Sequence, residues 1–287
     1  MDENLLNSIL RNNSFLYGIN RGEFALISCE NGKRSSKIIS NHLMNIATSN
    51  AENILVRIQD GNKNISDYEY RQLQFYSFLK RNNGVKIIDS ECVCFKDGEI
   101  KPKMHESVNG KDLYIVQNTF DSENPNNTNK NIMELELLLN AISSCGGKYK
   151  SVILPYLSYS KQERKTGRES ISAKKIIKSL ESNGASKIFT MDLHSDSIVG
   201  FSDETKCQII NLYASSLILK VIKDLAFSEL KLVSPDAGAM KQVAHYRKIT
   251  GYDIVTGQKL RDIDNTHKSE AIGIIGDIRD RSTFVYI

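Results

Sequence analysis

The sequence predicts an α/β protein in which parallel sheets are flanked by helices. Short, β-branched apolar runs alternate along the chain with longer segments whose apolar residues recur every three or four positions. Such alternation is typical of strand–helix–strand units, in which helices cover both faces of a parallel sheet. At 287 residues, 40% of them hydrophobic, the chain is longer than one core usually supports. We therefore expect two domains, with ligands bound at the carboxyl ends of the strands.

The order of the elements follows from the same pattern. Seven apolar runs are predicted to be buried strands, at residues 23–29, 112–117, 151–156, 187–192, 231–236, 252–257 and 282–287. Four periodic segments are predicted to be helices, at residues 33–47, 131–145, 171–184 and 210–225. Residues 60–84 are polar and rich in Tyr and Asn, which predicts a surface helix with loops. Residues 121–131 read as a low-complexity turn region.

Composition and charge exclude several classes of protein. The 38 basic and 34 acidic residues leave a net charge of +4, a mild surplus that does not require a nucleic-acid partner. No apolar run approaches the ~18 residues that span a bilayer, so we expect no membrane association. The cysteines show no paired metal spacing, which predicts reduced thiols in a cytoplasmic protein. They are Cys29, Cys92, Cys94, Cys145 and Cys207.

A charged turn, SKQERKTGRES at residues 160–170, lies between two of the predicted strands. Its lysines and arginines cannot serve a hydrophobic core, because burying an unpaired charge is costly. They are most simply explained as cations held out for an anionic ligand. The turn therefore predicts an enzyme that handles phosphate groups.

Three predicted strand ends carry candidate functional residues. Asp192 and His194 lie two residues apart, and on an extended segment they would share one face; the alternative is a structural histidine. Asp236 lies where a helix is predicted to begin, and the alternative of an ordinary helix cap is slightly favoured. Lys259 and Arg261 are predicted on a Gly-containing loop. The recurrence of such groups at successive strand ends favours a site.

The common nucleotide-binding motifs are missing from the sequence. Gly147-Lys148 lacks the earlier glycine of a phosphate-binding loop, because Ile142 stands there, and Tyr149 follows the lysine. No G-x-G-x-x-G, G-x-S-x-G or kinase catalytic-loop pattern occurs. Nucleotide binding through those routes is not expected.

Six motifs in order resemble the ribose-phosphate pyrophosphokinase family, also called phosphoribosyl pyrophosphate synthases. They are FKDGE (95–99), NIMELELLLNAI (131–142), VILPYLSYSKQERK (152–165), residues 171–201 around KIFTMDLH, NLYAS (211–215) and VSPDAGAMKQV (233–243). The match is colinear over most of residues 85–287, looser over 1–50, and residues 50–84 look like an insertion.

The resemblance implies two type I phosphoribosyltransferase-like domains, at residues 1–213 and 214–287. It further implies Mg²⁺-dependent transfer of the diphosphoryl group of ATP to O1 of ribose 5-phosphate, which releases AMP and supplies nucleotide biosynthesis. The implied assembly is a homo-oligomer, dimer-based and hexameric in the family.

The resemblance also assigns roles to individual residues. The family's nucleotide contacts fall on Phe95, Asp97, Gly98 and Glu99, and on Lys161, Gln162, Glu163, Arg164 and Lys165. Lys161 and Glu163 replace an arginine and an aspartate of the family pattern, and lysine loses the planar fork that arginine offers to phosphate. The metal positions fall on His194 and Asp236, with Asp192 and Asp203 nearby, and the catalytic pair on Lys259 and Arg261, the latter also near ribose 5-phosphate.

These assignments agree with the chemistry of diphosphoryl transfer. The transferred group spreads negative charge over its non-bridging oxygens, so catalysis consists mainly of positioning and of cations, which Mg²⁺, Lys259 and Arg261 would supply. Closure of the loop that contains Gly257 would exclude water. Histidine is an uncommon Mg²⁺ ligand, so the direct role of His194 rests on the resemblance.

The chain departs from the family pattern at its end. In the family, the last strand leads at once into an acidic, Thr- and Gly-rich loop that binds ribose 5-phosphate, whereas this chain stops at residues 282–287. We therefore expect an incomplete second domain, in either a fragment or a natural short form. Three hypotheses remain: a synthase with an incomplete sequence, an inactive nucleotide-binding subunit of a full-length partner, and an unrelated α/β nucleotide-binding protein.

Overall fold

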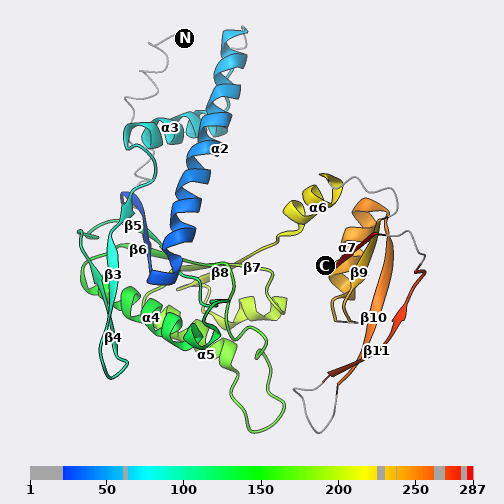
Figure 1. The fold of residues 1–287 in the computed structure, drawn as a ribbon. Helices are drawn as coiled ribbons and strands as arrows, with labels where there is room; N and C mark the ends of the chain where they lie inside the picture. Colours follow the sequence, from blue (N-terminus) through cyan, green and yellow to red (C-terminus); the bar gives the residue numbers. More distant parts are fainter. Residues whose placement is uncertain are drawn as a thin grey trace. The chain divides into compact units, whose positions relative to one another are not determined.

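The computed structural model describes residues 22–60, 64–224, 230–236, 238–261, 269–278 and 283–286. The chain divides into two compact units, Met1–Leu212 and Tyr213–Ile287, each with its own sheet (Figure 1). This division lies one residue before the domain boundary expected from the sequence. The expected strand 282–287 is β12, Thr283–Tyr286, and its two terminal residues lie outside the described part of the chain.

The first unit is built on a six-stranded parallel sheet. Its order is β2-β1-β5-β6-β7-β8, and every neighbouring pair is parallel. The strands are β1 (Phe24–Ser28), β2 (Ile87–Ile88), β5 (Asp112–Val116), β6 (Tyr149–Leu154), β7 (Lys187–Met191) and β8 (Gln208–Leu212). This parallel pairing confirms the predicted α/β class. The class was predictable because strands buried on both faces appear in a sequence as nearly continuous apolar runs.

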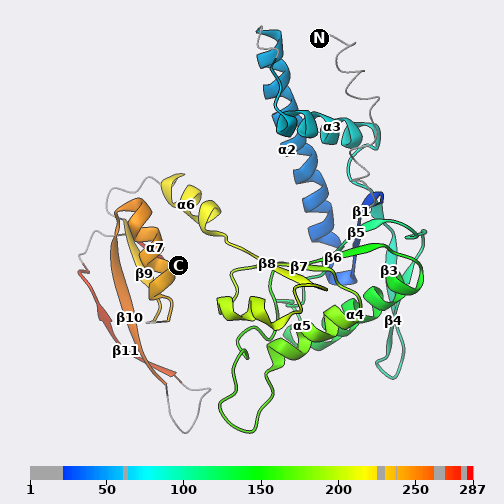
Figure 2. The same cartoon turned by 180° about the vertical axis from the view of Figure 1, so that it is seen from behind.

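Helices cover both faces of this sheet (Figure 2). On one face, apolar residues of α4 (Thr128–Ser144) and α5 (Ser172–Ser182) belong to the same core cluster as Ala25 and Ile27 of β1. On the other face, α2 (Lys33–Gln59) and α3 (Asp67–Arg81) pack around Leu26. Successive residues of β1 thus point to opposite faces, as strand geometry requires.

The helix α2 is longer than the sequence predicted, ending at Gln59 rather than at residue 47. Its extension packs against α3, the helix expected within residues 60–84, and Arg57 pairs with Glu69 at 2.7 Å. The start of α3 is fixed by a capping box, in which Ser66 and Glu69 satisfy each other's backbone N–H groups. The expected insertion at 50–84 therefore corresponds to the end of α2 together with α3.

One helix prediction was wrong. Residues 210–225 were expected to be helical throughout, but Gln208–Leu212 form β8, and α6 begins only at Ser215 and ends at Asp224. The residues of β8 gain backbone hydrogen bonds by pairing with β7, and this tertiary pairing overrides a local pattern that fits either structure.

A two-stranded antiparallel hairpin, β3 (Ser90–Cys94) and β4 (Ile100–Met104), was also missed. Half of its strand residues are exposed, several are charged, and Pro102 lies within β4. Because proline is tolerated in an edge strand but cannot donate to a ladder, such a segment gives little strand signal in the sequence.

The second unit is built on a four-stranded sheet in the order β11-β10-β9-β12. Its strands are β9 (Leu230–Ser234), β10 (Asp253–Arg261), β11 (Ser269–Ile275) and β12. β9 is parallel to β10 and β12, while β10 and β11 form an antiparallel pair. The helices α6 and α7 (Met240–Thr250) enclose a small core around Leu232 and Tyr246. α7 was expected only as a helix that begins near Asp236, and it begins at Met240, whereas β11 was not predicted from the sequence.

The structure also bears on possible membrane spans and on the state of the cysteines. Across the ranges that the structure describes, no helix is long and apolar enough to cross a membrane. All five cysteines are free thiols, two of them buried and two exposed.

Candidate functional site

The strand order of the first sheet reverses between β1 and β5, where α/β proteins often bind ligands. Here residues that follow β1 and β5 are joined by hydrogen bonds of their own side chains. Asn31 and Asn118 donate from their side chains to each other's backbone carbonyls at 2.7 and 3.0 Å. Glu134, on α4, accepts the backbone N–H of Glu30 at 2.7 Å, and burial raises the pKa of its carboxyl. The cation-rich loop and the pair Asp192 and His194 lie instead after β6 and β7.

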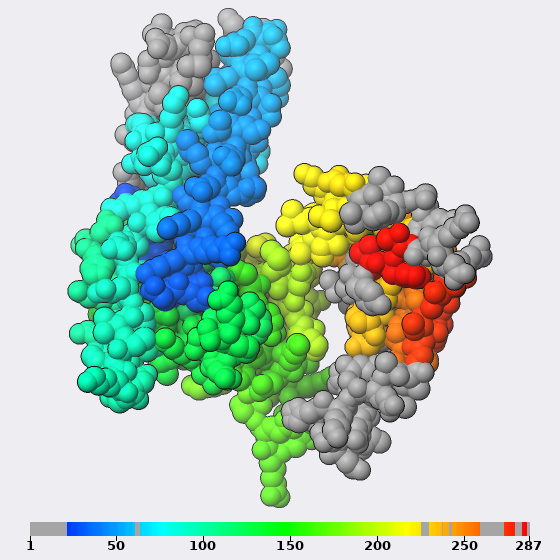
Figure 3. All heavy atoms as spheres, viewed as in Figure 1, coloured from blue at the N-terminus to red at the C-terminus, as the bar shows by residue number. Residues whose placement is uncertain are grey.

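The cation-rich loop links β6 to α5. Its basic residues are all exposed, namely Lys161, Arg164, Lys165 and Arg168. The loop is closed at its base, because Ala173 donates its backbone N–H to Gln162 O at 3.3 Å and Gln162 donates to Tyr159 O at 2.9 Å. In Figure 3 the green segment between β6 and α5 projects as a narrow column. The cations are therefore held in solvent by a loop whose base is fixed at the start of α5.

Glu163 differs from the other predicted nucleotide contacts of this loop. Its side chain is 10% exposed, whereas that of Arg164 is 85% exposed. Oε1 of Glu163 lies 3.5 Å from Nε of Arg164, and Oε2 is buried without a hydrogen-bond partner in the described structure. Arg164 thus turns its Nε toward a carboxylate while the rest of its guanidinium remains in solvent.

The FKDGE motif forms the turn between β3 and β4. Phe95 donates its backbone N–H to Glu99 O at 2.8 Å, and Asp97 Oδ1 accepts the N–H of Glu99 at 3.1 Å. Gly98 has φ +92°, a left-handed conformation that glycine adopts without strain. The Phe95 side chain is about half exposed, so its ring is available for stacking against a planar group. The nucleotide role of the motif stays a prediction.

Asp192 and His194 follow β7, but not in the predicted way. β7 ends at Met191, and Asp192 has φ +48°, so the segment is not extended and the argument that both side chains share a strand face was wrong. The backbone turns because Asp192 donates its N–H to Leu212 O at 2.9 Å, and Leu193 donates to Asn211 Oδ1 at 3.1 Å. The side chains of Asp192 and His194 are both exposed.

Sequence reasoning missed Asn211 because its segment was predicted to be helical. The motif NLYAS had been noted, but only the pairing of β8 with β7 places Asn211 beside the Asp192 turn. A prediction of residues 208–212 as a strand next to β7 would have placed Asn211 near Asp192.

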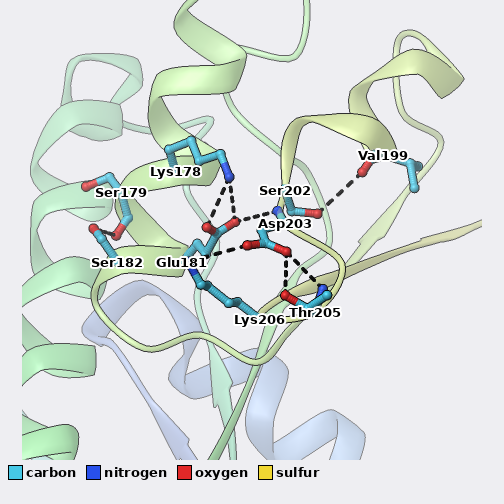
Figure 4. A network of polar contacts seen from close by, with 9 residues as sticks. All are labelled: Lys178, Ser179, Glu181, Ser182, Val199, Ser202, Asp203, Thr205 and Lys206. Atoms are coloured by element: carbon cyan, nitrogen blue, oxygen red, sulfur yellow. Dashed lines mark hydrogen bonds and ion pairs between the residues drawn. The ribbon is translucent and has the colours of Figure 1, made fainter.

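Asp203, the other predicted acidic neighbour of the metal, lies in a turn before β8 (Figure 4). Its Oδ1 accepts the N–H of Thr205 at 3.1 Å and the hydroxyl of Thr205 at 2.6 Å, and Lys206 lies 3.4 Å from Oδ2. The hydrogen bond from the Thr205 hydroxyl is the main cause that lowers the pKa of this carboxyl. A metal ion would have to compete with these donors, and the metal role of Asp203 stays a prediction.

Asp236 belongs to the second unit. Its Oδ1 accepts the backbone N–H groups of Gly238 at 2.9 Å and Ala239 at 3.1 Å, just before α7. These hydrogen bonds fix the turn before α7, but the N-cap residue of that helix is Ala239, so Asp236 is not the ordinary helix cap that the sequence slightly favoured. They use one carboxylate oxygen, and a metal role of Asp236 through the other oxygen stays a prediction.

Lys259 and Arg261 lie within β10 rather than on a loop, so that prediction is corrected. β10 continues to Arg261 because it pairs with β11, with a register shift between Gln258 and Lys259. Gly257, taken as a loop signal, instead permits close approach: a Cβ there would lie 2.6 Å from Pro235 O. The side chains of Lys259 and Arg261 lie outside the described part of the structure.

The donor chemistry bears on the expected Mg²⁺. Within the described residues, no group of three or more His, Cys, Asp or Glu side chains could hold a metal ion. Burial raises the pKa of Cys92 and Cys207 to about 11, which disfavours the thiolate form that binds metals. Mg²⁺ commonly binds through one or two carboxylates together with substrate phosphates and water. Asp192 follows β7, the sheet neighbour of the strand β6 that leads into the cation-rich loop, and it fits that second mode rather than a cage made of protein alone.

Comparison with known proteins identifies the group to which the chain is related. The family model for the N-terminal domain of ribose phosphate pyrophosphokinase matches residues 31–184. The ribose-phosphate pyrophosphokinase of Helicobacter hepaticus is 35% identical over 185 residues, which cover 64% of this chain and 57% of the relative. That of Campylobacter jejuni is 35% identical over 214 residues, 74% of this chain and 66% of the relative.

A solved structure agrees with the fold. The crystal structure of phosphoribosylpyrophosphate synthetase from Mycobacterium smegmatis matches with a TM-score of 0.61 and 22% identity, over 87% of this chain and 67% of that chain. At this identity the likeness supports the fold alone. The chain spans less than two thirds of the length of the Helicobacter and Campylobacter relatives. Because the family model covers more than half of its residues, the chain belongs to the ribose phosphate pyrophosphokinase family.

Proposed function

We propose that the protein is a ribose-phosphate diphosphokinase, which transfers the diphosphoryl group of Mg-ATP to O1 of ribose 5-phosphate and releases AMP. The observation that carries the proposal is the loop after β6, with its four exposed cations and a base fixed by hydrogen bonds. A polyphosphate chain is the natural ligand of such a loop, because charge-assisted hydrogen bonds to phosphate are strong and salt-sensitive. The family model spans this loop, and the Helicobacter and Campylobacter relatives carry the name ribose-phosphate pyrophosphokinase.

In this proposal the first unit binds the nucleotide. Arg164 and Lys165 neutralise the triphosphate, and the half-exposed ring of Phe95 stacks on the adenine base. Asp192 and His194 contribute to an Mg²⁺ position that the ATP phosphates complete. When bound, Mg²⁺ withdraws negative charge from the phosphate oxygens during transfer.

The second unit supplies the catalytic cations in this proposal. Lys259 and Arg261 lie two residues apart on β10, after the register shift, and would stabilise the charge that develops on the transferred group. Arg261 would also approach the phosphate of ribose 5-phosphate. No residue of the chain needs to act as a covalent nucleophile, because positioning and cations provide most of the rate enhancement.

The identity of the nucleotide product tests the reaction. The protein is incubated with Mg-ATP, with and without ribose 5-phosphate, and AMP and ADP are separated by chromatography. The proposal predicts AMP that forms only with ribose 5-phosphate, and no ADP. ATP binding without AMP formation would contradict it and would favour a nucleotide-binding subunit without catalysis. ADP formation would indicate transfer of a single phosphoryl group.

A further inference from the structure

The end of β8 holds the turn that follows β7. Two consecutive backbone N–H groups of this turn are accepted by β8: Asp192 donates to Leu212 O at 2.9 Å, and Leu193 donates to Asn211 Oδ1 at 3.1 Å. Since a backbone N–H can be accepted by the amide oxygen but not by the amide nitrogen, this contact also fixes which way the Asn211 amide points. The turn is therefore tied to β8 by one main-chain bond and one side-chain bond.

A side chain is needed here because the β ladder cannot continue. The pairing of β7 and β8 runs to Met191 and Leu212, and Asp192 then leaves the extended conformation with φ +48°. A non-glycine residue in this conformation costs about 1 kcal/mol or more and persists only where its surroundings hold it. Without a partner from Asn211, the N–H of Leu193 would lose the contact that keeps the turn in place.

The amide nitrogen of Asn211 also indicates that the side chain serves the turn after β7 rather than the sheet. Asn211 is the register partner of Thr190, so both side chains lie on the same face of the sheet. Yet Nδ2 of Asn211 and Oγ1 of Thr190 are both buried without hydrogen-bond partners among the described residues. An asparagine that served only to stabilise the sheet would be expected to satisfy its nitrogen as well. In the described structure, the Asn211 side chain makes one hydrogen bond, in which its oxygen accepts the N–H of Leu193 in the Asp192–His194 turn.

We propose that Asn211 is a positioning residue that sets the orientation of Asp192 and His194 for the metal–nucleotide complex. The inference rests on the proposed function, because it takes this turn as the Mg²⁺ position. Residues that orient metal ligands through a second layer of hydrogen bonds typically change metal affinity by about 10-fold to 100-fold when they are removed. Asn211 acts through the backbone of Leu193 and is not itself a ligand.

Two variants separate positioning from general stability. Asn211→Ala removes the acceptor, whereas Asn211→Asp keeps an oxygen that can accept the Leu193 N–H. Asn183→Ala is the control, since Asn183 also makes a side-chain hydrogen bond of its own, 2.9 Å to Ser179 O at the end of α5. Each protein is studied by hydrogen exchange over residues 190–196 and by calorimetric ATP titration at increasing Mg²⁺ concentrations.

We expect Asn211→Ala to speed exchange in residues 190–196 and to raise the Mg²⁺ concentration needed for half-maximal ATP binding about 10-fold or more. Asn211→Asp should restore the protection, and Asn183→Ala should change neither measurement. Unchanged exchange and unchanged Mg²⁺ dependence in Asn211→Ala, beside a wild type that binds Mg-ATP, would overturn the positioning role alone. A wild type without Mg²⁺-dependent ATP binding would overturn the proposed function, and this inference with it.

Discussion

The carboxylate of Glu181, on α5, accepts the backbone N–H of Asp203 at 2.8 Å and so joins that helix to the segment before β8 (Figure 4). Lys178 donates to the same carboxylate at 3.0 and 3.1 Å. Burial by itself would raise the pKa of Glu181, but the hydrogen bonds from Asp203 and Lys178 outweigh it and lower the pKa below its ordinary value. This network fixes the segment that leads into β8, and β8 in turn holds the candidate metal turn.

Removal of Glu181 should therefore destabilise the first unit. Glu181→Ala leaves the N–H of Asp203 without its acceptor, and we expect a loss of about 1–3 kcal/mol in the free energy of unfolding at pH 7, measured by urea denaturation. Since the pKa of Glu181 is lowered in the folded state, its contribution is present above its unfolded pKa and is lost as the pH falls through the folded pKa. The deficit should shrink below about pH 4.5.

Glu204→Ala is the control for this prediction, because Glu204 is an exposed acidic neighbour in the same segment. It should leave the unfolding free energy nearly unchanged. An equal loss in both variants, or a deficit in Glu181→Ala that does not depend on pH, would show that the hydrogen bond to Asp203 is not the cause.

Glu134 should give the opposite pH dependence. Its pKa is raised by burial, so its folded-state pKa lies above its unfolded value. Its contribution to stability is then largest below the unfolded pKa and is lost as the pH rises through the folded pKa. We expect melting temperatures of Glu134→Gln to fall less than those of the wild type between pH 5 and pH 8. Glu136→Gln, a change on the same helix, should retain the wild-type profile; a shared profile in all three proteins would refute the assignment.

Asp236 and His194, which are both predicted to bind the metal, have different surroundings, and their roles can be compared by mutation. Asp236→Asn keeps an oxygen for the N–H groups of Gly238 and Ala239, so the turn before α7 should stay folded while one carboxylate charge is lost. His194→Ala removes an exposed side chain. Both variants should weaken Mg²⁺-dependent ATP binding with little change in thermal melts followed by circular dichroism. A large drop in melting temperature without any effect of Mg²⁺ would assign these residues to the fold alone.

The sequence predicted the parts of the fold whose signal is local. Buried strands such as β5 and β7 read as apolar runs between helical segments, and the parallel class follows from their alternation. Residues 210–212 of β8 were taken for the start of a helix because Ile210 and Leu212 fit either period, and only pairing with β7 decides between them. β3 and β4 were missed because exposed, charged edge strands carry little apolar pattern.

The candidate site was predictable to a smaller extent. The exposure of the cation-rich loop followed from the cost of burying charge, and the structure confirms it. The conformation of Asp192 and the contact from Asn211 depend on strand register, which no single segment of the sequence contains. The extension of β10 through Arg261 depends likewise on β11, so Gly257 was interpreted as a loop residue rather than as a point of close backbone contact.

The central claim is that the loop after β6 binds the phosphates of ATP, and calorimetric titration with Mg-ATP tests it most directly. Arg164→Ala and Lys165→Ala should each weaken binding by about 10-fold to 100-fold, as expected from the loss of a charge-assisted hydrogen bond worth about 1.5–3 kcal/mol. The wild-type affinity should fall as salt is raised. Lys80→Ala, which removes the same charge from α3, should bind like the wild type. Equal affinities for Mg-ATP in all four proteins would contradict the account.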